Sequence, residues 1–136
     1  MMRWMLLAAL AALLASPAHA QTGRVQPPPA DEYELSAVDV MPQPINTGLL
    51  SRVMGLVYPP ALRDAGIGGK VTLRFLVLRS GAVDPESVEV VDASHPDFAA
   101  GAAIAIRILQ FRPAEVDGRP VRVWVVLPVS FTTGAG

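Results

Sequence analysis

The feature that most constrains the fold is the alternation of apolar residues with other residues along two segments of the chain. One segment runs over residues 71–78 and the longer one over residues 121–131. Successive side chains of a β-strand point to opposite faces, so a spacing of two predicts two strands that each bury one face. Ser80-Gly81 is a turn signal, and residues 87–91 are predicted to return as the second strand of a hairpin.

Helical spacing of apolar residues precedes and interrupts these strands. We predict a helix from residue 48 or 49 to about residue 56, capped by Thr47, and a short helix over residues 60–65 with Gly66 after its end. His95 belongs to a helix-start cluster, and a helix over residues 98–109 should follow. The order helix, strand, strand, helix, strand predicts an α+β fold with the helices on one face of the sheet.

The composition excludes several kinds of chemistry. The chain of 136 residues has no cysteine, which excludes disulfides and thiolate sites, and its net charge of −1 lacks the basic excess of a nucleic-acid binder. His95 has no second histidine or cysteine near it in the sequence, whereas a zinc site takes three or four ligands. The serines lack the Gly-x-Ser-x-Gly elbow of a hydrolase. We therefore expect no enzyme, no catalytic or metal-binding residues, no cofactor and no small-molecule substrate.

The first 20 residues have the pattern of a secretory signal peptide. Arg3 precedes an apolar run over residues 5–15, and Ala18-His19-Ala20 is a small-x-small cleavage site. As a helix this run covers about 16 Å, well short of the roughly 30 Å of hydrocarbon in a bilayer. We expect residues 1–20 to be removed, residues 21–47 to form a proline-containing linker, and residues 48–133 to form the domain.

Mass spectrometry of the exported protein should find a mature chain that begins at Gln21, because the cleavage site ends at Ala20. The alternative is that the apolar run stays in the inner membrane as an anchor. A membrane-bound chain that retains residues 1–20 would contradict cleavage and favour this alternative.

A series of short motifs runs through the predicted fold in a specific order. It contains Tyr58-Pro59, Phe111-Arg112-Pro113-Ala114, Asp117-Gly118 and Pro120-Val121, followed by the long alternating strand. The further positions are Gly66-Ile67, Gly69, Val71, Phe75, Gly81, Val83, Ala93-Ser94-His95-Pro96, Trp124, Pro128 and Phe131. No single motif is specific, but together, in this order and spacing, they resemble the C-terminal domain of TonB-family proteins.

This resemblance implies two helices packed on one face of a three-stranded antiparallel sheet. It also implies an envelope adaptor that captures an extended peptide, the TonB box of outer-membrane transporters, as a strand beside residues 121–131. Strand addition of this kind satisfies the free N–H and C=O groups of an edge strand. We therefore expect a periplasmic interaction module with envelope proteins as partners, TonB-dependent outer-membrane transporters among them, or a homodimer. The alternative is a short membrane-anchored energy transducer that couples a proton-driven inner-membrane motor to outer-membrane transport.

The candidate partner site combines the last predicted strand with the sheet face that points away from the helices. Residues 74, 76, 122, 124 and 126 alternate with apolar residues predicted to face the helices, so they share the opposite face. A half-apolar face with a tryptophan and arginines favours partner contact. The alternative is an ordinary surface on which Trp124 lies under arginine stems. The candidate residues are Arg74, Leu76, Arg122, Val123, Trp124, Val125, Val126 and Leu127.

Residues 33–40 are a candidate additional N-terminal strand. Their apolar residues alternate roughly by two, and the acidic residues followed by Leu-Ser-Ala-Val weakly resemble a TonB box. One hypothesis is that this segment pairs with the edge strand of its own domain, or of a neighbouring copy, and controls access to that edge. The alternative is a solvated tail.

Overall fold

The computed structural model describes residues 31–133 of the chain. The predicted signal peptide, residues 1–20, lies outside the described residues. No helix within the described range is long and apolar enough to cross a membrane.

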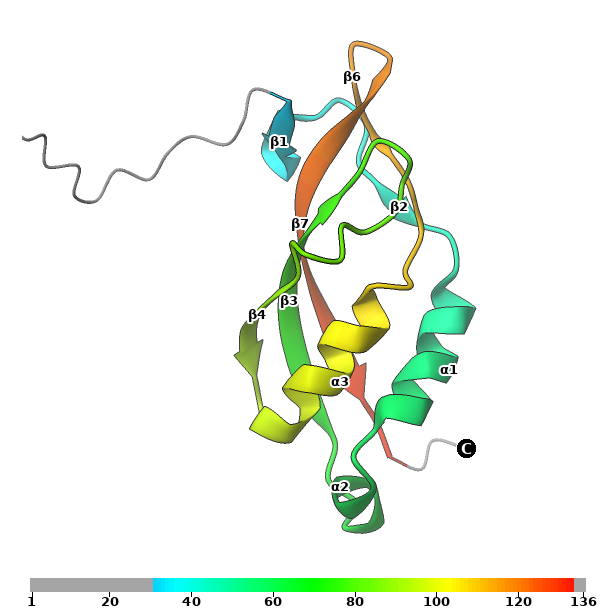
Figure 1. Cartoon of the computed structure of the whole chain (residues 1–136), viewed down its shortest axis with the longest axis vertical. Helices are drawn as coiled ribbons and strands as arrows, with labels where there is room; N and C mark the ends of the chain where they lie inside the picture. The colour runs from blue at the N-terminus through cyan, green and yellow to red at the C-terminus, as the bar shows by residue number, and fades with distance from the viewer. Residues whose placement is uncertain (1–30, 134–136) are drawn as a thin grey trace, which may run out of the picture.

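A curled sheet forms one layer of the molecule (Figure 1). Its strands are β1 (Glu32–Glu34), β7 (Arg119–Phe131), β3 (Gly69–Val77) and β4 (Glu89–Ala93), in that spatial order. β3 pairs antiparallel with both β4 and β7, which confirms the predicted three-stranded antiparallel sheet. β1 adds to the other side of β7 in the parallel direction, so the whole sheet is mixed.

Two main helices, α1 (Thr47–Val57) and α3 (Pro96–Ile106), cover one face of this sheet, and the short α2 (Pro60–Asp64) follows α1 (Figure 1). The predicted α+β arrangement is therefore confirmed. His95 is the N-cap residue of α3, as predicted, and its Nδ1 accepts a hydrogen bond of 3.1 Å from the Asp97 N–H.

Both main helices differ slightly from their predicted bounds, and α3 begins at Pro96, two residues before the predicted start at residue 98. Thr47 is the first residue of α1 rather than its cap, because Asn46 occupies the N-cap position. The Asn46 side chain instead joins the start of α1 to the chain after α3: it donates to the Ile108 carbonyl (2.9 Å) and accepts from the Gln110 N–H (2.7 Å). α3 ends at Ile106, before the predicted residue 109, since the next residues form tighter turns.

Three short strands were not predicted. β2 (Gln43–Pro44) pairs with β5 (Phe111–Arg112), and β6 (Ala114–Val116) pairs with the beginning of β7.

The strand predicted over residues 87–91 lies two residues later, as β4 (Glu89–Ala93). The Ser87 hydroxyl accepts a hydrogen bond from the Leu76 N–H (2.8 Å), which holds Ser87 in the preceding loop.

The candidate strand over residues 33–40 is shorter than predicted. The strand in this segment, β1, ends at Glu34 and is followed by a 3-10 turn, η1 (Leu35–Ala37), and Val40 then forms an isolated antiparallel bridge with Glu115. Leu35 and Val38 pack against the core, so the chain turns inward after Glu34. The hypothesis that the segment 33–40 pairs with the edge strand of its own domain is confirmed for Tyr33 and Glu34, and the pairing begins one residue earlier, at Glu32.

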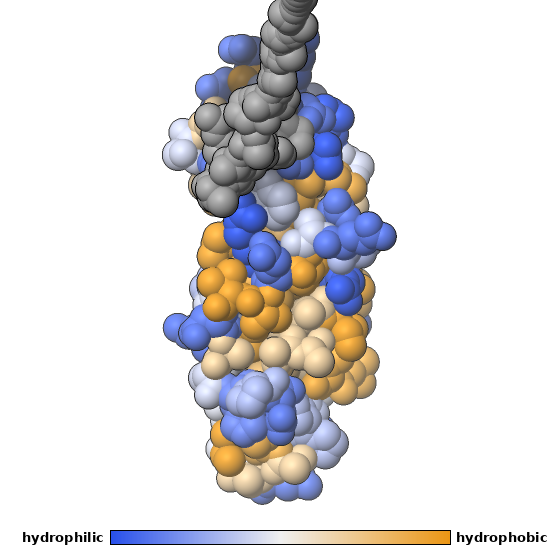
Figure 2. All heavy atoms as spheres, turned by 60° about the vertical axis from the view of Figure 1, so that its left-hand side comes forward, coloured by the Kyte–Doolittle hydropathy of each residue, from blue (hydrophilic) through white to orange (hydrophobic). Residues whose placement is uncertain are grey.

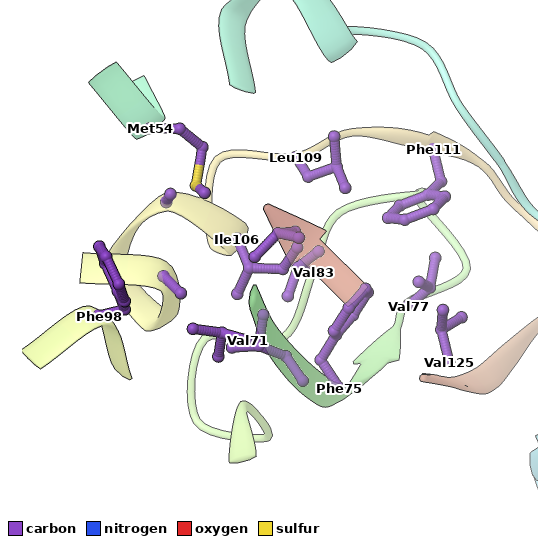
Figure 3. Packing of buried hydrophobic residues seen from close by; sticks show 14 of the residues in the cluster. Met54, Val71, Phe75, Val77, Val83, Phe98, Ile106, Leu109, Phe111 and Val125 are labelled. Carbon is purple, nitrogen blue, oxygen red and sulfur yellow. The ribbon is translucent and has the colours of Figure 1, made fainter. Parts of the chain in front are cut away.

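The core lies between the helices and the sheet (Figure 3). Phe98 of α3 stacks on Phe131 of β7 with ring centroids 4.5 Å apart, and the Tyr58 ring meets both edge-on. The Tyr58 hydroxyl donates to the Ile67 carbonyl. This aromatic cluster joins the end of α1 and the start of α3 to the end of β7.

Candidate functional site

Hydrogen bonds of β3 show which residues of β7 bond to it. Ser94 N–H donates to the Lys70 carbonyl (2.9 Å) and Asp84 N–H donates to the Leu76 carbonyl (2.9 Å), on the side of β3 away from β7. Main-chain groups alternate between the two sides of a strand, so the odd-numbered residues of β3 bond to β7. Their partners in β7 are also odd-numbered, from Val123 to Phe131.

β6 forms its hydrogen bonds with the same side of β7 as β3 does. Glu115, which lies opposite Pro120, exchanges main-chain hydrogen bonds with Val40 rather than with β7. The bonds between β6 and β7 therefore also involve odd-numbered residues of β7. The even-numbered residues direct their main-chain groups to the opposite side, which we call the outer edge. The outer edge consists of the main-chain groups of Arg122, Trp124, Val126, Pro128 and Ser130.

β1 occupies the first part of the outer edge. Its register places Glu32 opposite Arg122, Tyr33 opposite Val123 and Glu34 opposite Trp124. The Tyr33 side chain packs against the core, whereas the two glutamates share the outward face with Arg122 and Trp124. From Val126 onward, the outer edge has no strand partner within residues 31–133.

Asp31 fixes the beginning of β1 through two arginines. Its Oδ2 lies 3.1 Å from Nη2 of Arg79 and 3.3 Å from Nη1 of Arg122. The hydrogen bond from Arg122 lowers the pKa of the Asp31 carboxyl below its ordinary value. The carboxylate is therefore charged at neutral pH, and this contact is lost only as the pH falls through the lowered pKa.

Further ion pairs continue along β1. Glu32 Oε2 lies 3.8 Å from Nη2 of Arg122, and Glu34 Oε1 lies 3.4 Å from Nη2 of Arg74. Arg74 also contacts Glu89 of β4 at 3.5 Å, and its guanidinium lies over the Trp124 ring, 3.9 Å from the centroid. Arginines of β3 and β7 thus hold an acidic segment along the outer edge.

A groove lies beside the part of the outer edge that β1 leaves free. It has a volume of about 410 Å³ and runs between α1 and the last residues of β7. Its apolar lining comes from both sides: Leu50, Met54, Tyr58, Leu127, Val129 and Phe131. An extended segment placed along this edge would have apolar side chains of α1 on its inner side.

The candidate residues predicted from the sequence fall into two groups. Arg74, Leu76, Arg122, Trp124 and Val126 share the outward face of the sheet, as the alternation predicts. Leu76 is only 2% exposed, so its side chain offers no free surface. The second group, Val123, Val125 and Leu127, points toward the helices.

Figure 2 turns the side of the molecule that carries β1 and β4 toward the viewer and shows apolar patches divided by hydrophilic side chains. Val126 of β7 and both Val90 and Val91 of β4 are exposed apolar residues of the sheet.

The sequence did not predict Arg79 or the groove residues of α1 as part of the site. Arg79 lies outside the alternating pattern, and the apolar face of α1 looks like ordinary core packing in the sequence.

An edge strand with a free stretch, beside an apolar groove, is a geometry by which a domain can receive an extended peptide as an added strand. The family model for the C-terminal region of the Gram-negative bacterial TonB protein matches residues 54–133, more than half of the chain. The chain therefore belongs to the TonB C-terminal family, as its motifs indicated. This family is non-enzymatic, and its domain is periplasmic and generally interacts with outer-membrane transporters.

Among solved structures, the chain is similar to the solution NMR structure of the Pseudomonas aeruginosa TonB C-terminal domain. The sequence identity is 20% and the TM-score is 0.46, and the match covers 73% of this chain and 91% of the other. No curated protein matches the chain significantly.

Proposed function

We propose that this chain is an exported TonB-like interaction module that binds an extended peptide of an outer-membrane transporter. The peptide adds as a strand to the outer edge of β7. One observation carries this proposal: the outer edge already holds an extended segment, β1, as a paired strand. Strand addition needs only main-chain groups on the receiving edge, and these continue beyond β1 at Val126 and Ser130.

The two faces of an added strand would meet different surfaces. Its inward side chains would enter the groove beside α1, where Leu50 and Met54 provide apolar contacts. Its outward side chains would lie next to Trp124 and Val126. The main chain supplies affinity in this mode of binding, and the groove supplies selectivity for apolar residues at alternate positions.

Trp124→Ala and Val126→Glu should each weaken peptide binding, by about threefold to tenfold, because both side chains lie beside the added strand. The probes are labelled peptides that represent the periplasmic N-terminal segments of the host's outer-membrane transporters, and fluorescence anisotropy measures their affinity. Val91→Glu is the matched control, because Val91 is similarly exposed (59%, against 53% for Val126) but lies on β4 at the far edge of the sheet.

Amide hydrogen exchange, measured with and without the bound peptide, locates the site of binding. Peptide addition should protect the N–H groups of Val126 and Ser130, which face the outer edge, and leave Val91 unchanged. If peptides bound equally to both variants and to the unsubstituted chain, without protection at Val126 and Ser130, the outer edge would not be the binding site.

A further inference from the structure

We propose that β1 is an internal competitor for the outer edge and that the peptide which displaces it is acidic. In this arrangement, residues 31–34 occupy the beginning of the edge until a partner replaces them. The partner runs parallel to β7, with carboxylates at alternate positions toward the arginines and a large apolar side chain between them. This inference rests on the proposed strand addition and names the chemistry of its ligand.

The hydrophobic core does not depend on β1. None of residues 31–53 is buried, and the first buried residue of the core is Met54. The match to the family model also begins at residue 54. β1 contributes a half-buried Tyr33 ring and a short run of main-chain pairing, so its release would leave the packing between the two main helices and the sheet intact.

The contacts that hold β1 can be exchanged for equivalent ones. The ion pairs of Asp31 and Glu34 involve exposed carboxylates, and exposed ion pairs of this kind are weak individually. The Glu32 side chain is only 9% exposed, so its pair with Arg122 is the most shielded of these contacts. Release of β1 would leave Arg79 and Arg122 without an acidic partner among the described residues, whereas Arg74 would keep Glu89. An incoming peptide regains these contacts only if it brings its own carboxylates.

Arg122 is the central group for this exchange. Arg122 forms ion pairs with both Asp31 and Glu32, yet its buried Nε has no hydrogen-bond acceptor among residues 31–133. An acceptor from a partner would satisfy this donor, which β1 leaves unsatisfied. A peptide carboxylate that also reached the Arg122 Nε would therefore form one more hydrogen bond at this site than β1 does.

Competition follows from the covalent connection between β1 and the domain. A tethered segment acts at an effective concentration in the millimolar range for short linkers. The affinity for an external peptide is reduced by the fraction of molecules in which the edge is free. Weakening β1 should therefore raise the affinity for an external acidic peptide.

The test uses the full chain and a labelled synthetic peptide with the sequence of residues 31–38, which is the segment that already fits the edge. The chain with Asp31→Asn, Glu32→Gln and Glu34→Gln should bind this peptide about tenfold more tightly than the unsubstituted chain, as measured by fluorescence anisotropy. The amide resonances of residues 122–126 should shift on binding. A peptide with the same three acids replaced by amides should lose this gain.

The matched control carries Asp64→Asn, Glu86→Gln and Asp92→Asn, which change the net charge equally at acids without an ion pair among the described residues. Its affinity should equal that of the unsubstituted chain. Tyr33→Ala is a second way to weaken β1 and should change the affinity in the same direction as the amide substitutions. Equal affinities in all these proteins, or resonance shifts away from β7, would overturn the proposal.

The outcomes also separate this inference from the proposed function. If transporter peptides bound the unsubstituted chain and the Asn/Gln variant equally, strand addition would stand and the competitor role of β1 would be wrong. If only the variant bound the acidic 31–38 peptide and no transporter peptide bound either protein, β1 would be a competitor and the proposed partner class would be wrong.

Discussion

Phe98→Ala should lower the free energy of unfolding by about 3–5 kcal/mol, the usual loss for truncation of a buried phenylalanine. Phe98 is 0% exposed, stacks on Phe131 and contacts the edge of the Tyr58 ring. Its removal opens a cavity at the place where α1, α3 and β7 meet. Urea unfolding followed by circular dichroism measures the loss.

Ile104→Ala provides the control for this substitution in the same helix. Ile104 is 53% exposed, so its truncation removes little buried apolar surface and should cost less than about 1 kcal/mol. Comparable losses for Phe98→Ala and Ile104→Ala would show that α3 does not pack on the sheet through Phe98.

Gly81→Ala should also destabilise the protein strongly, by about 2–4 kcal/mol. Gly81 has a φ of +90°, and an added Cβ would lie 2.0 Å from the Phe111 carbonyl oxygen. The backbone cannot move away easily, because the Phe111 N–H donates to the Gly81 carbonyl (2.9 Å) and the Gly81 N–H donates to the Leu78 carbonyl (2.8 Å). Thermal unfolding monitored by circular dichroism measures the effect.

Gly66→Ala separates the cost of the dihedral angle from the cost of crowding. Gly66 has a similar positive φ of +73°, but an added Cβ would meet no atom of the described residues within 4 Å. Its substitution should cost only about 1 kcal/mol, the penalty of a left-handed conformation for an L-residue. Equal losses at Gly81 and Gly66 would mean that the contact with Phe111 is unimportant.

The sheet was predictable because its signals are local and repeated. β3 and β7 each alternate over many residues, and Asp117-Gly118, with φ angles of +52° and +75°, forms the turn that its sequence indicates. The helix start at His95 was predictable for the same reason, since its cap and its proline are neighbours in the chain.

The remaining elements depend on contacts between distant parts of the sequence. β2 and β6 are only a few residues long, too short for a periodic pattern, and they exist because Pro44 pairs with Phe111 and Ala114 with Val121. Asn46 has the sequence signal of a capping residue, yet its side chain bonds to Ile108 and Gln110 instead. No local rule selects such a partner.

The sequence predicted which residues of the candidate site lie on the outward face of the sheet, but it did not predict the groove beside α1. Alternation places Arg74, Trp124 and Val126 on one face, and the structure shows them together. The burial of Leu76 and the groove beside α1 depend on how loops and helices fold over the sheet, which strand periodicity does not contain.

Pro128 has a further consequence for a protein with an open strand edge. The nitrogen of Pro128 faces the outer edge and carries no hydrogen, so the row of donors is interrupted between Val126 and Ser130. A single peptide that adds along the edge from Val126 to Ser130 loses only one hydrogen bond at this gap. Two copies that joined edge to edge along the full length of β7 would each leave an acceptor unmatched, which opposes the stacking of chains into fibrils. The same edge can therefore receive a ligand while it resists aggregation.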